Sequence, residues 1–314
     1  MEIQRCKLAF TECWFLAVRE KQPGTFWEST RPFNLIIPPL GCYYADPCLV
    51  KKNGTNYMFF EEYDLKSRKG TIACTIIESS VAHSKPETVL ERDYHLSYPC
   101  VFEWQGDMYM VPESSANRTI ELYRAVEFPH RWKLIKVLMK DIKAADTTLF
   151  LYRGRCWMFT NIAGAPESEP DHDLFDHGLF LFVAESPLGP WRPHRKNPIV
   201  SDVSRSRPAG PLFFSNGDLL RPSQDCSRDY GQAMWLNRIT EFSEDEYSEA
   251  PLARLNPGFL QRDIRTHTLS QNEDWEVRDG FWWIAKSQRT SNQQYLAATR
   301  NVQSVLKLHN SRGV

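Results

Sequence analysis

The sequence lacks the features of several large protein classes. No apolar run approaches the length of about 18 residues that a membrane-spanning helix needs. Residues 1–10 contain Glu2, Arg5 and Lys7 and have no apolar signal core. The formal net charge is −1, so no overall field attracts nucleic acid or an anionic membrane. We therefore expect a cytoplasmic protein with no membrane span and no nucleic-acid partner, or a domain cut from a longer secreted protein.

Signals for metal sites are also missing. None of the eight cysteines forms a Cys-x-x-Cys pair, the spacing typical of many zinc sites. We therefore expect no metal and no cofactor. Cys48, Cys100 and Cys156 lie in strand-like runs, where a free thiol packs as a small hydrophobic group. Free, buried thiols are the expectation for a cytosolic protein, although the even count also permits disulfides.

Helical periodicity is scarce as well. The acidic stretch 243–250 could form one short helix, and a solvated loop fits it equally well. What the sequence does contain favours strands, because 13% of its residues are aromatic. Hydrophobic residues make up 42%, enough for a sizeable core. A length of 314 residues is normal for a single closed β architecture.

One pattern recurs along the chain: an apolar run, a glycine turn and an aromatic-rich run that ends at a polar residue. Such a unit is typical of a β-hairpin. In four copies the glycine comes eight residues after the start and the polar end seven residues later. These copies are Asp46–Gly54–Glu61, Tyr98–Gly106–Glu113, Asp146–Gly154–Asn161 and Ala209–Gly217–Gln224. A weaker fifth copy begins around His267 and continues into Trp275.

The spacing of these units predicts the architecture. Successive starts lie 48 to 63 residues apart, which leaves room for two further strands in each unit, as in a propeller blade. We predict an all-β, five-bladed β-propeller formed by residues 1–314 as one domain. Its blades should start near residues 46, 98, 146, 209 and 267. The run 14–19 has no hairpin of its own, so it should pair with the last blade and close the ring.

Hairpin geometry then places the polar residues. The start of the first strand and the end of the second lie side by side, so these residues should surround the mouth of the central channel. The candidate catalytic residues are Asp46, Asp146, Glu113 and Asp225. The candidate substrate-binding residues are Glu62, Tyr98, Arg207, Arg221, Gln224 and His267.

This grouping has a chemical and a structural interpretation. Crowded carboxylates raise one another's pKa, which separates the roles of acid and base. Alternatively, an aspartate at a strand start binds backbone amides in a turn. Arg207 and Arg221 could bind a sugar carboxylate or phosphate, or pair with Asp225, Glu113 or Glu62.

A long insertion at 163–178 follows the third hairpin. Loops of this length in compact domains are usually functional or disordered. Its possible ligands have no recognised metal spacing, so we expect a mobile loop near the mouth. They are Asp171, His172, Asp173, Asp176 and His177.

The repeats resemble the five-bladed arabinanase and β-xylosidase type of glycoside hydrolase. The resemblance implies that Asp46 is a general base and that Asp146 orients the acid and tunes its pKa. It places His267 near the axis, beside an ion or water or as a satisfied channel histidine. The hydrolases begin blade four with Glu-Gly-Pro, whose glutamate is the acid, whereas this chain has Ala209-Gly210-Pro211. Glu113, Asp225 or Glu62 would then have to supply the proton, or the site binds sugars without cleaving them.

A closer resemblance covers nearly the whole chain. It is to the N-terminal propeller domain of plant glucosamine inositolphosphorylceramide transferases and its free-standing bacterial relatives. The plant proteins carry a separate C-terminal glycosyltransferase domain, so transferase activity is not expected of this chain, which ends at Val314. A glycosyltransferase partner is implied. The motifs that carry the resemblance are residues 95–99, HLSYP; 144–150, AADTTLF; 207–211, RPAGP; and 221–226, RPSQDC.

Two functions follow from these patterns. The first is an unusual glycosidase or transglycosylase with Asp46 as base, Asp146 as modulator and Glu113 or Asp225 as acid. The second is a non-catalytic module that binds a glycan or glycoconjugate, such as one with an anionic or amino sugar. A third is different chemistry on the same architecture, because a fold does not determine function.

Overall fold

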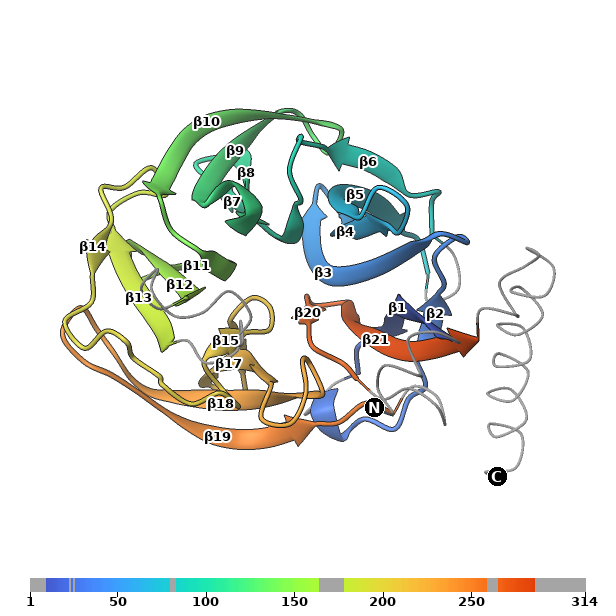
Figure 1. Cartoon of the computed structure of the whole chain (residues 1–314). Helices are drawn as coiled ribbons and strands as arrows, with labels where there is room; N and C mark the ends of the chain where they lie inside the picture. Colours follow the sequence, from blue (N-terminus) through green and yellow to red (C-terminus); the bar gives the residue numbers. More distant parts are fainter. Residues whose placement is uncertain are drawn as a thin grey trace.

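The computed structural model describes residues 10–22, 24, 26–79, 83–163, 178–258 and 265–285. In this part of the chain five β-sheets are arranged around a central axis (Figure 1). The prediction of an all-β, five-bladed propeller is confirmed. The acidic and histidine residues predicted for the loop 163–178 lie outside the described residues: Asp171, His172, Asp173, Asp176 and His177.

The first three blades are meanders of four antiparallel strands, and their innermost strands are β3, β7 and β11. Blade one consists of β3 (Cys42–Lys52), β4 (Thr55–Asp64), β5 (Lys69–Ile77) and β6 (Glu87–Leu90). Blade two consists of β7 (Ser97–Trp104), β8 (Asp107–Ser114), β9 (Thr119–Glu127) and β10 (Arg131–Lys140). Blade three consists of β11 (Ala144–Tyr152), β12 (Arg155–Ile162), β13 (Gly178–Ala184) and β14 (Arg192–Pro193).

The last two blades are less regular, because their inner strands are short. Blade four consists of β15 (Arg207–Pro208), β16 (Phe213–Ser215), β17 (Asp218–Asp225), β18 (Ala233–Phe242) and β19 (Tyr247–Leu255). Blade five consists of β20 (Leu269–Gln271), β21 (Trp275–Ala285), β1 (Phe10–Glu20) and β2 (Asn34–Ile36). Two short 3₁₀ helices lie in loops, η1 (Phe26–Glu28) and η2 (Ser115–Asn117).

The N-terminal segment closes the ring, as the sequence predicts. Strand β1 pairs antiparallel with β21 over its whole length, with Leu16 opposite Asp279. A second N-terminal strand, β2, adds the outer edge of the same blade. The side chains of Leu16 and Val18 pack in one cluster with Met58, Phe60 and Val277, which joins blade five to blade one. Closure therefore depends on residues from both ends of the described chain.

Truncating Leu16 tests this closure. Leu16 is completely buried, so Leu16→Ala removes apolar contacts and leaves a cavity. We expect the free energy of unfolding to fall by about 2–5 kcal/mol, measured by urea denaturation. Val126 is 53% exposed, so Val126→Ala should change stability by no more than about 0.5 kcal/mol. Equal, small effects of both substitutions would show that β1 does not hold the ring together.

A bulge at the start of the inner strand recurs in the first three blades. The register slips by one residue there, and the extra residue is left-handed: Asp46 (φ 54), Tyr98 (φ 42) and Asp146 (φ 52). Aspartate adopts this conformation more readily than most residues, whereas for a bulky tyrosine it is strained. Bulges of this kind redirect side chains and are common next to active sites. The repeat register in the sequence thus corresponds to a repeated backbone feature.

Buried thiols connect neighbouring blades. Cys48, Cys100 and Cys156 are free and buried, as predicted. The Cys48 Sγ accepts a hydrogen bond from Val101 N–H at 3.5 Å, and the Cys100 Sγ accepts one from Leu149 N–H at 3.3 Å. The thiols of Cys48 and Cys100 therefore each satisfy a backbone amide of the next inner strand.

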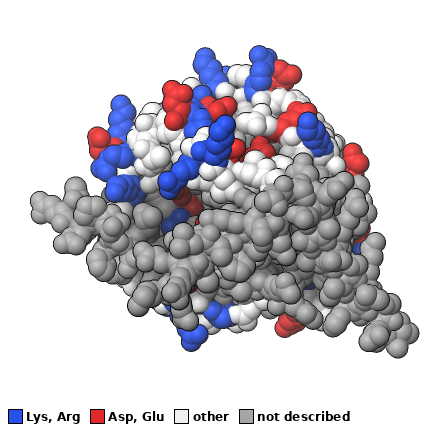
Figure 2. Space-filling model, turned by 45° about the vertical axis from the view of Figure 1, so that its right-hand side comes forward, with Lys and Arg blue, Asp and Glu red and all other residues white. Residues whose placement is uncertain are grey.

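The stretch 243–250 is not a helix, and only its first half, 243–246, is the solvated loop that was the alternative. It makes a turn and then enters the outer strand β19, in which Tyr247 and Leu255 are buried at the two ends. Pairing with β18 outweighs the acidic composition, because the strand supplies partners for the backbone amides. Among the described residues, no helix has the length and apolar character needed to cross a membrane. Basic and acidic side chains are interspersed over the described part of the face in Figure 2.

Candidate functional site

All five blades contribute to one pocket of about 270 Å³, hereafter the central pocket. Its wall is mixed, with carboxyl groups from blades one, two and three and basic side chains from blades four and five. Three aromatic rings complete it. The lining residues are Trp14, Tyr43, Ala45, Asp46, Glu61, His95, Ser97, Glu113, Asp146, Arg207, Tyr230 and His267.

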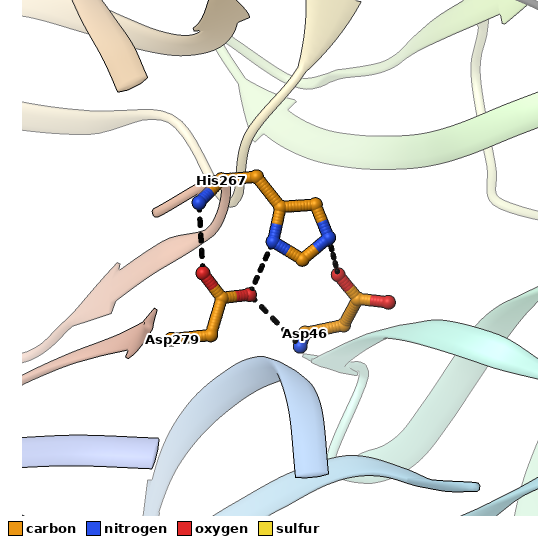
Figure 3. A group of neighbouring side chains, drawn as sticks. All are labelled: Asp46, His267 and Asp279. Atoms are coloured by element: carbon orange, nitrogen blue, oxygen red, sulfur yellow. Dashed lines mark hydrogen bonds and ion pairs between the residues drawn. The ribbon is translucent and has the colours of Figure 1, made fainter. Parts of the chain in front are cut away.

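Asp46 belongs to a chain of buried ionisable groups (Figure 3). The imidazole of His267 lies between two carboxylates, with Nε2 3.4 Å from Asp46 Oδ1 and Nδ1 2.6 Å from Asp279 Oδ2. Asp279 also accepts the backbone N–H groups of His267 and Thr268, at 2.8 and 3.0 Å. The Thr268 hydroxyl donates to Asp46 Oδ1 at 2.8 Å. Asp46 is therefore held in one orientation from blade five.

Burial determines the protonation of this chain. Burial, together with the charges of Asp146 and Asp279, raises the pKa of Asp46 to about 6, although His267 and Thr268 oppose the shift. Burial alone would lower the pKa of His267, but the neighbouring carboxylates Asp279 and Asp46 outweigh it and raise that pKa. Around neutral pH, Asp46 is therefore mostly ionised. The raised pKa of His267 favours its protonated form.

The same three residues form the one group within the described residues that brings enough ligand atoms together for a metal ion. One oxygen or nitrogen from each of Asp46, His267 and Asp279 lies within 4.8 Å of the others. Both nitrogens of His267 already face carboxylate oxygens, an arrangement that suits a protonated imidazole. We interpret the group as a chain of ion pairs.

Across the pocket, Glu113 and Asp146 are linked. The Asp146 N–H donates to Glu113 Oε2 at 3.0 Å. The Asp146 carboxylate accepts hydrogen bonds from Arg207 Nε and from Gln224 Nε2, the latter at 2.8 Å. Arg207 Nη2 is 4.0 Å from Glu113. Burial and the Asp146 charge raise the pKa of Glu113 to about 8, despite the opposing effect of Arg207. Glu113 is therefore mainly protonated at neutral pH.

Glu61 is a further carboxyl group in the pocket. It is 4% exposed, and its Oε1 has no hydrogen-bond partner among the described residues. His95 is an ionisable neighbour, with its Nε2 3.5 Å from Oε1. A Cβ atom at Gly70 would come within 2.6 Å of this oxygen, so only glycine lets β5 approach so closely. Burial, and then the charge of Asp46, raises the pKa of Glu61 well above its usual range.

Aromatic rings cover the side of the pocket near His267. The Trp14 ring lies 4.2 Å from the His267 ring, centroid to centroid, and the Tyr230 ring lies 5.2 Å from it. Tyr230 also stacks under the guanidinium of Arg207, 5.1 Å from the ring centroid. Such rings offer flat apolar surfaces beside charged groups. Sequence reasoning missed Trp14, Tyr43 and Tyr230, because none of them occupies a position in the hairpin repeat.

Tyr98 and Gln224 lie behind the pocket wall. The Tyr98 hydroxyl contacts Thr148 Oγ1 at 2.8 Å and accepts the Gly210 N–H at 2.6 Å. Tyr98 also lines a separate space of about 10 Å³ on the channel, enough for about one water molecule. Gln224 is completely buried and supports Asp146. Neither side chain lines the central pocket. Both instead support pocket residues, the Tyr98 N–H by donating to Asp46 and the Gln224 amide by donating to Asp146.

Three other predicted residues point elsewhere. Glu62 alternates with Glu61 on β4, so its side chain lies on the opposite face of the strand, within 3.5 Å of Thr88. Arg221 pairs with Glu249 on the outer strand β19, at 2.6 Å. Asp225 pairs with Arg254 at 2.9 Å and accepts the Ser227 hydroxyl. These bonds outweigh burial and lower the pKa of Asp225, which therefore does not serve as an acid.

Ala209 stands where the hydrolase resemblance places the acid. It is completely buried in an apolar cluster with Phe26, Met234, Leu236 and Leu269. This position therefore contributes packing and no proton. The carboxyl groups that do reach the pocket come from blades one to three.

Comparison with known proteins agrees with this architecture. A family 117 glycoside hydrolase from Zobellia galactanivorans superposes with a TM-score of 0.54 over 86% of this chain and 90% of its own, at 13% identity. The GH43B protein of a Bacteroides ovatus xyloglucan locus gives a TM-score of 0.54 over 84% of this chain and 58% of its own, at 14% identity. At these identities the likeness shows the fold alone.

Sequence relatives are more specific. Glucosamine inositolphosphorylceramide transferase 1 of Oryza sativa subsp. japonica is 35% identical over 219 residues, or 67% of this chain. The Arabidopsis thaliana protein of the same name is 35% identical over 233 residues, or 72% of this chain. In both cases the match spans 28% of the relative's length. The sequence profile of the N-terminal region of glucosamine inositolphosphorylceramide transferase 1 matches residues 39–258. The chain therefore belongs to the family defined by this N-terminal region, which shares its propeller fold with glycoside hydrolases.

Proposed function

We propose that the central pocket is the active site of an unusual glycosidase or transglycosylase, with Asp46 as base and Glu113 as acid. One observation carries the proposal. Two carboxyl groups with different surroundings face one pocket: Asp46 lies beside His267, and Glu113 lies beside Asp146. Pairs of carboxyl groups whose environments push their pKa values apart are a recurring basis for acid and base roles.

Asp46 suits the role of base. With a pKa of about 6 it is mostly ionised near neutral pH, yet it is basic enough to accept a proton. Its Oδ1 is held by Thr268 and faces His267, and its Oδ2 receives the Tyr98 N–H at 3.3 Å. The carboxylate is therefore positioned before any ligand binds.

Glu113 suits the role of acid that the residue at position 209 does not fill. Its pKa of about 8 keeps it protonated near neutral pH. Within the described residues, Oε1 makes no hydrogen bond, so it is available to a leaving group, while Oε2 is held by the Asp146 N–H. Asp146 keeps the modulating role expected of it, with its charge partly offset by Arg207.

The proposed step conserves protons and charge. Glu113 donates its proton to the oxygen of the glycosidic bond as the bond between that oxygen and the anomeric carbon breaks. A water molecule attacks the anomeric carbon and transfers a proton to Asp46. In transglycosylation the hydroxyl group of a second sugar takes the place of water. Proton exchange with solvent then restores both carboxyl groups.

A glycoconjugate is the proposed substrate. The named relatives are glucosamine inositolphosphorylceramide transferases, and this chain corresponds to 28% of their length. Their names support a role next to a glycosyltransferase, either as its partner or in the same pathway.

The experiment is a glycan array combined with a screen for hydrolysis and transfer. We expect a bound glycan whose glycosidic bond is cleaved or transferred by the wild-type chain. Binding without turnover would favour the second candidate, a glycan-binding module. Two observations favour that candidate: the rings of Trp14 and Tyr230 line the pocket, and the blade-four position of the hydrolase acid is filled by buried Ala209. No binding and no turnover would contradict both.

A further inference from the structure

Arg207 lies between the two linked carboxyl groups of the central pocket, Asp146 and Glu113. Its Nε donates to Asp146 Oδ2, whereas its Nη2 is 4.0 Å from Glu113 Oε2, too far for a hydrogen bond. The side chain is 11% exposed and lines the pocket. The two carboxyl groups therefore share one cation unequally, because Arg207 binds Asp146 and is close to Glu113 without binding it.

The two oxygens of Glu113 have different surroundings. Oε2, which Arg207 approaches, is also the oxygen that accepts the Asp146 N–H at 3.0 Å. This amide is free to donate because Asp146 lies in the bulge of β11 and has no partner in the pairing with β12. Oε1 is the oxygen from which the proton leaves in the proposed reaction. A leaving group at Oε1 therefore does not compete with the guanidinium at Oε2.

The charges around Glu113 explain why a cation is needed there. Burial, then the charges of Asp146 and Asp46, oppose its ionisation, whereas Arg207 favours it. His267 is held by Asp46 and Asp279, so in the described part of the chain Arg207 is the cation within reach of Glu113. The other titratable groups of the pocket add no negative charge near neutral pH: Glu61, which burial keeps protonated, His95, Tyr43 and Tyr230.

The contacts of Arg207 permit a small shift toward Glu113. Tyr230 stacks against the guanidinium, 5.1 Å from the ring centroid, and this leaves the N–H groups at the edge of the guanidinium for the carboxylates. Gln224 Nε2 also donates to Asp146 Oδ2, at 2.8 Å, so Asp146 keeps a partner when Arg207 moves. A movement of about 1 Å brings Nη2 to the usual distance of a charge-assisted hydrogen bond.

We propose that Arg207 is a positioning residue for the acid: as Glu113 gives up its proton through Oε1, Nη2 of Arg207 closes onto Oε2 and holds the new carboxylate. The inference rests on the proposed function, in which Glu113 is the acid. Before proton transfer this contact is too long for a hydrogen bond, and afterwards it is a charge-assisted one. An interaction that strengthens as charge develops lowers the barrier, whereas one of constant strength does not. When solvent returns a proton to Glu113, Arg207 again binds Asp146 alone.

The first test needs no substrate. Crystals of the full chain are compared at about pH 6 and about pH 9.5, below and above the Glu113 pKa of about 8. The distance from Arg207 Nη2 to Glu113 Oε2 should shorten from 4.0 Å to about 2.8 Å at the higher pH. An NMR titration of the Glu113 carboxyl carbon then compares wild type with Arg207→Gln. The midpoint should rise by about one to three pH units in the variant, because an opposite charge close to Glu113 is lost.

Arg205→Gln is the matched control. Arg205 also binds an aspartate, Asp202, at 2.9 Å, but it does not line the pocket. This substitution should leave the Glu113 midpoint and the turnover unchanged.

The second test uses the substrate identified in the screen. Arg207→Gln should lower kcat by about 10²–10³-fold with little change in KM, because the lost interaction forms only as Glu113 becomes charged. The loss should be much smaller for a leaving group that departs without protonation. Arg207→Lys keeps the positive charge but has no fork to reach both carboxylates, so it should show the same pattern in weaker form.

The inference is overturned if the distance from Nη2 to Oε2 stays near 4.0 Å when Glu113 is ionised, or if Arg207→Gln leaves the midpoint unchanged. Equal losses on all substrates would also contradict it. The wild-type crystals and Arg207→Lys keep the test decisive if Arg207→Gln does not fold. Turnover of a glycan with an unmoved distance and midpoint refutes this inference alone. A shortened distance and a raised midpoint in a protein that turns over no glycan support the link between Arg207 and Glu113 and contradict the proposed function.

Discussion

Replacing Asp46 with asparagine is expected to reduce turnover by about 10²–10⁴-fold while leaving the fold intact. Asparagine has nearly the same shape and tolerates the left-handed conformation at this position (φ 54). It keeps an acceptor for the Thr268 hydroxyl but does not take up a proton at neutral pH. The loss would be measured as kcat/KM on the substrate identified in the screen, with circular dichroism as the check on folding.

Asp141→Asn is the matched control for this substitution. Asp141 is exposed and also left-handed (φ 56), so the change has the same backbone requirements outside the pocket. It should leave turnover unchanged. If the protein only binds glycans, Asp46→Asn should instead weaken affinity by a modest factor. Unchanged binding and activity in both Asp46→Asn and Asp146→Asn would show that the site lies elsewhere in the molecule.

Glu113→Gln should also cost about 10²–10⁴-fold, but only for substrates whose leaving group needs a proton. Glutamine keeps the acceptor for the Asp146 N–H and has no acidic proton to donate. A substrate with a strongly acidic phenol as leaving group departs without protonation, so the variant should turn it over with a much smaller loss. This dependence on the leaving group separates an acid from a residue that only shapes the pocket.

The same substitution should make the fold more stable at pH 8. The folded state holds the Glu113 proton up to a pKa of about 8, compared with the usual value of 4.5. Wild-type stability therefore falls as pH rises from about 4.5 to about 8, because the unfolded chain ionises first. Glutamine removes this dependence, so the variant should melt at a higher temperature than wild type at pH 8. A lower melting temperature together with equal losses on all substrates would mean that Glu113 is structural.

The repeat in the sequence predicts the architecture well because its spacing follows from two backbone features, the inner hairpin and the bulge at its start. The constant distance from each start to the glycine turn follows from the length of the inner hairpin. The repeated position of Asp46, Tyr98 and Asp146 corresponds to a bulge in each of three blades. The unpaired run 14–19 also supplies the strand that closes the ring.

The direction of individual side chains is harder to predict. Glu61 and Glu62 both end the same strand, and only the pleat decides which of them faces the pocket. Asp225 and Arg221 look like pocket residues until their partners on the outer strand β19 are known. Those partners, Arg254 and Glu249, lie about thirty residues along the chain and carry no motif. Trp14 and Tyr230 also could not be predicted as pocket residues, because they come from segments outside the repeat.

The dependence of turnover on pH tests the central claim most directly. Wild-type kcat/KM should rise as Asp46 ionises around pH 6 and fall as Glu113 loses its proton around pH 8, with a maximum between them. In Glu113→Gln, assayed on the activated substrate, the fall around pH 8 should disappear while the rise around pH 6 remains. A profile that keeps both limbs in Glu113→Gln, or full turnover in Asp46→Asn at every pH, would contradict the assignment of these two residues.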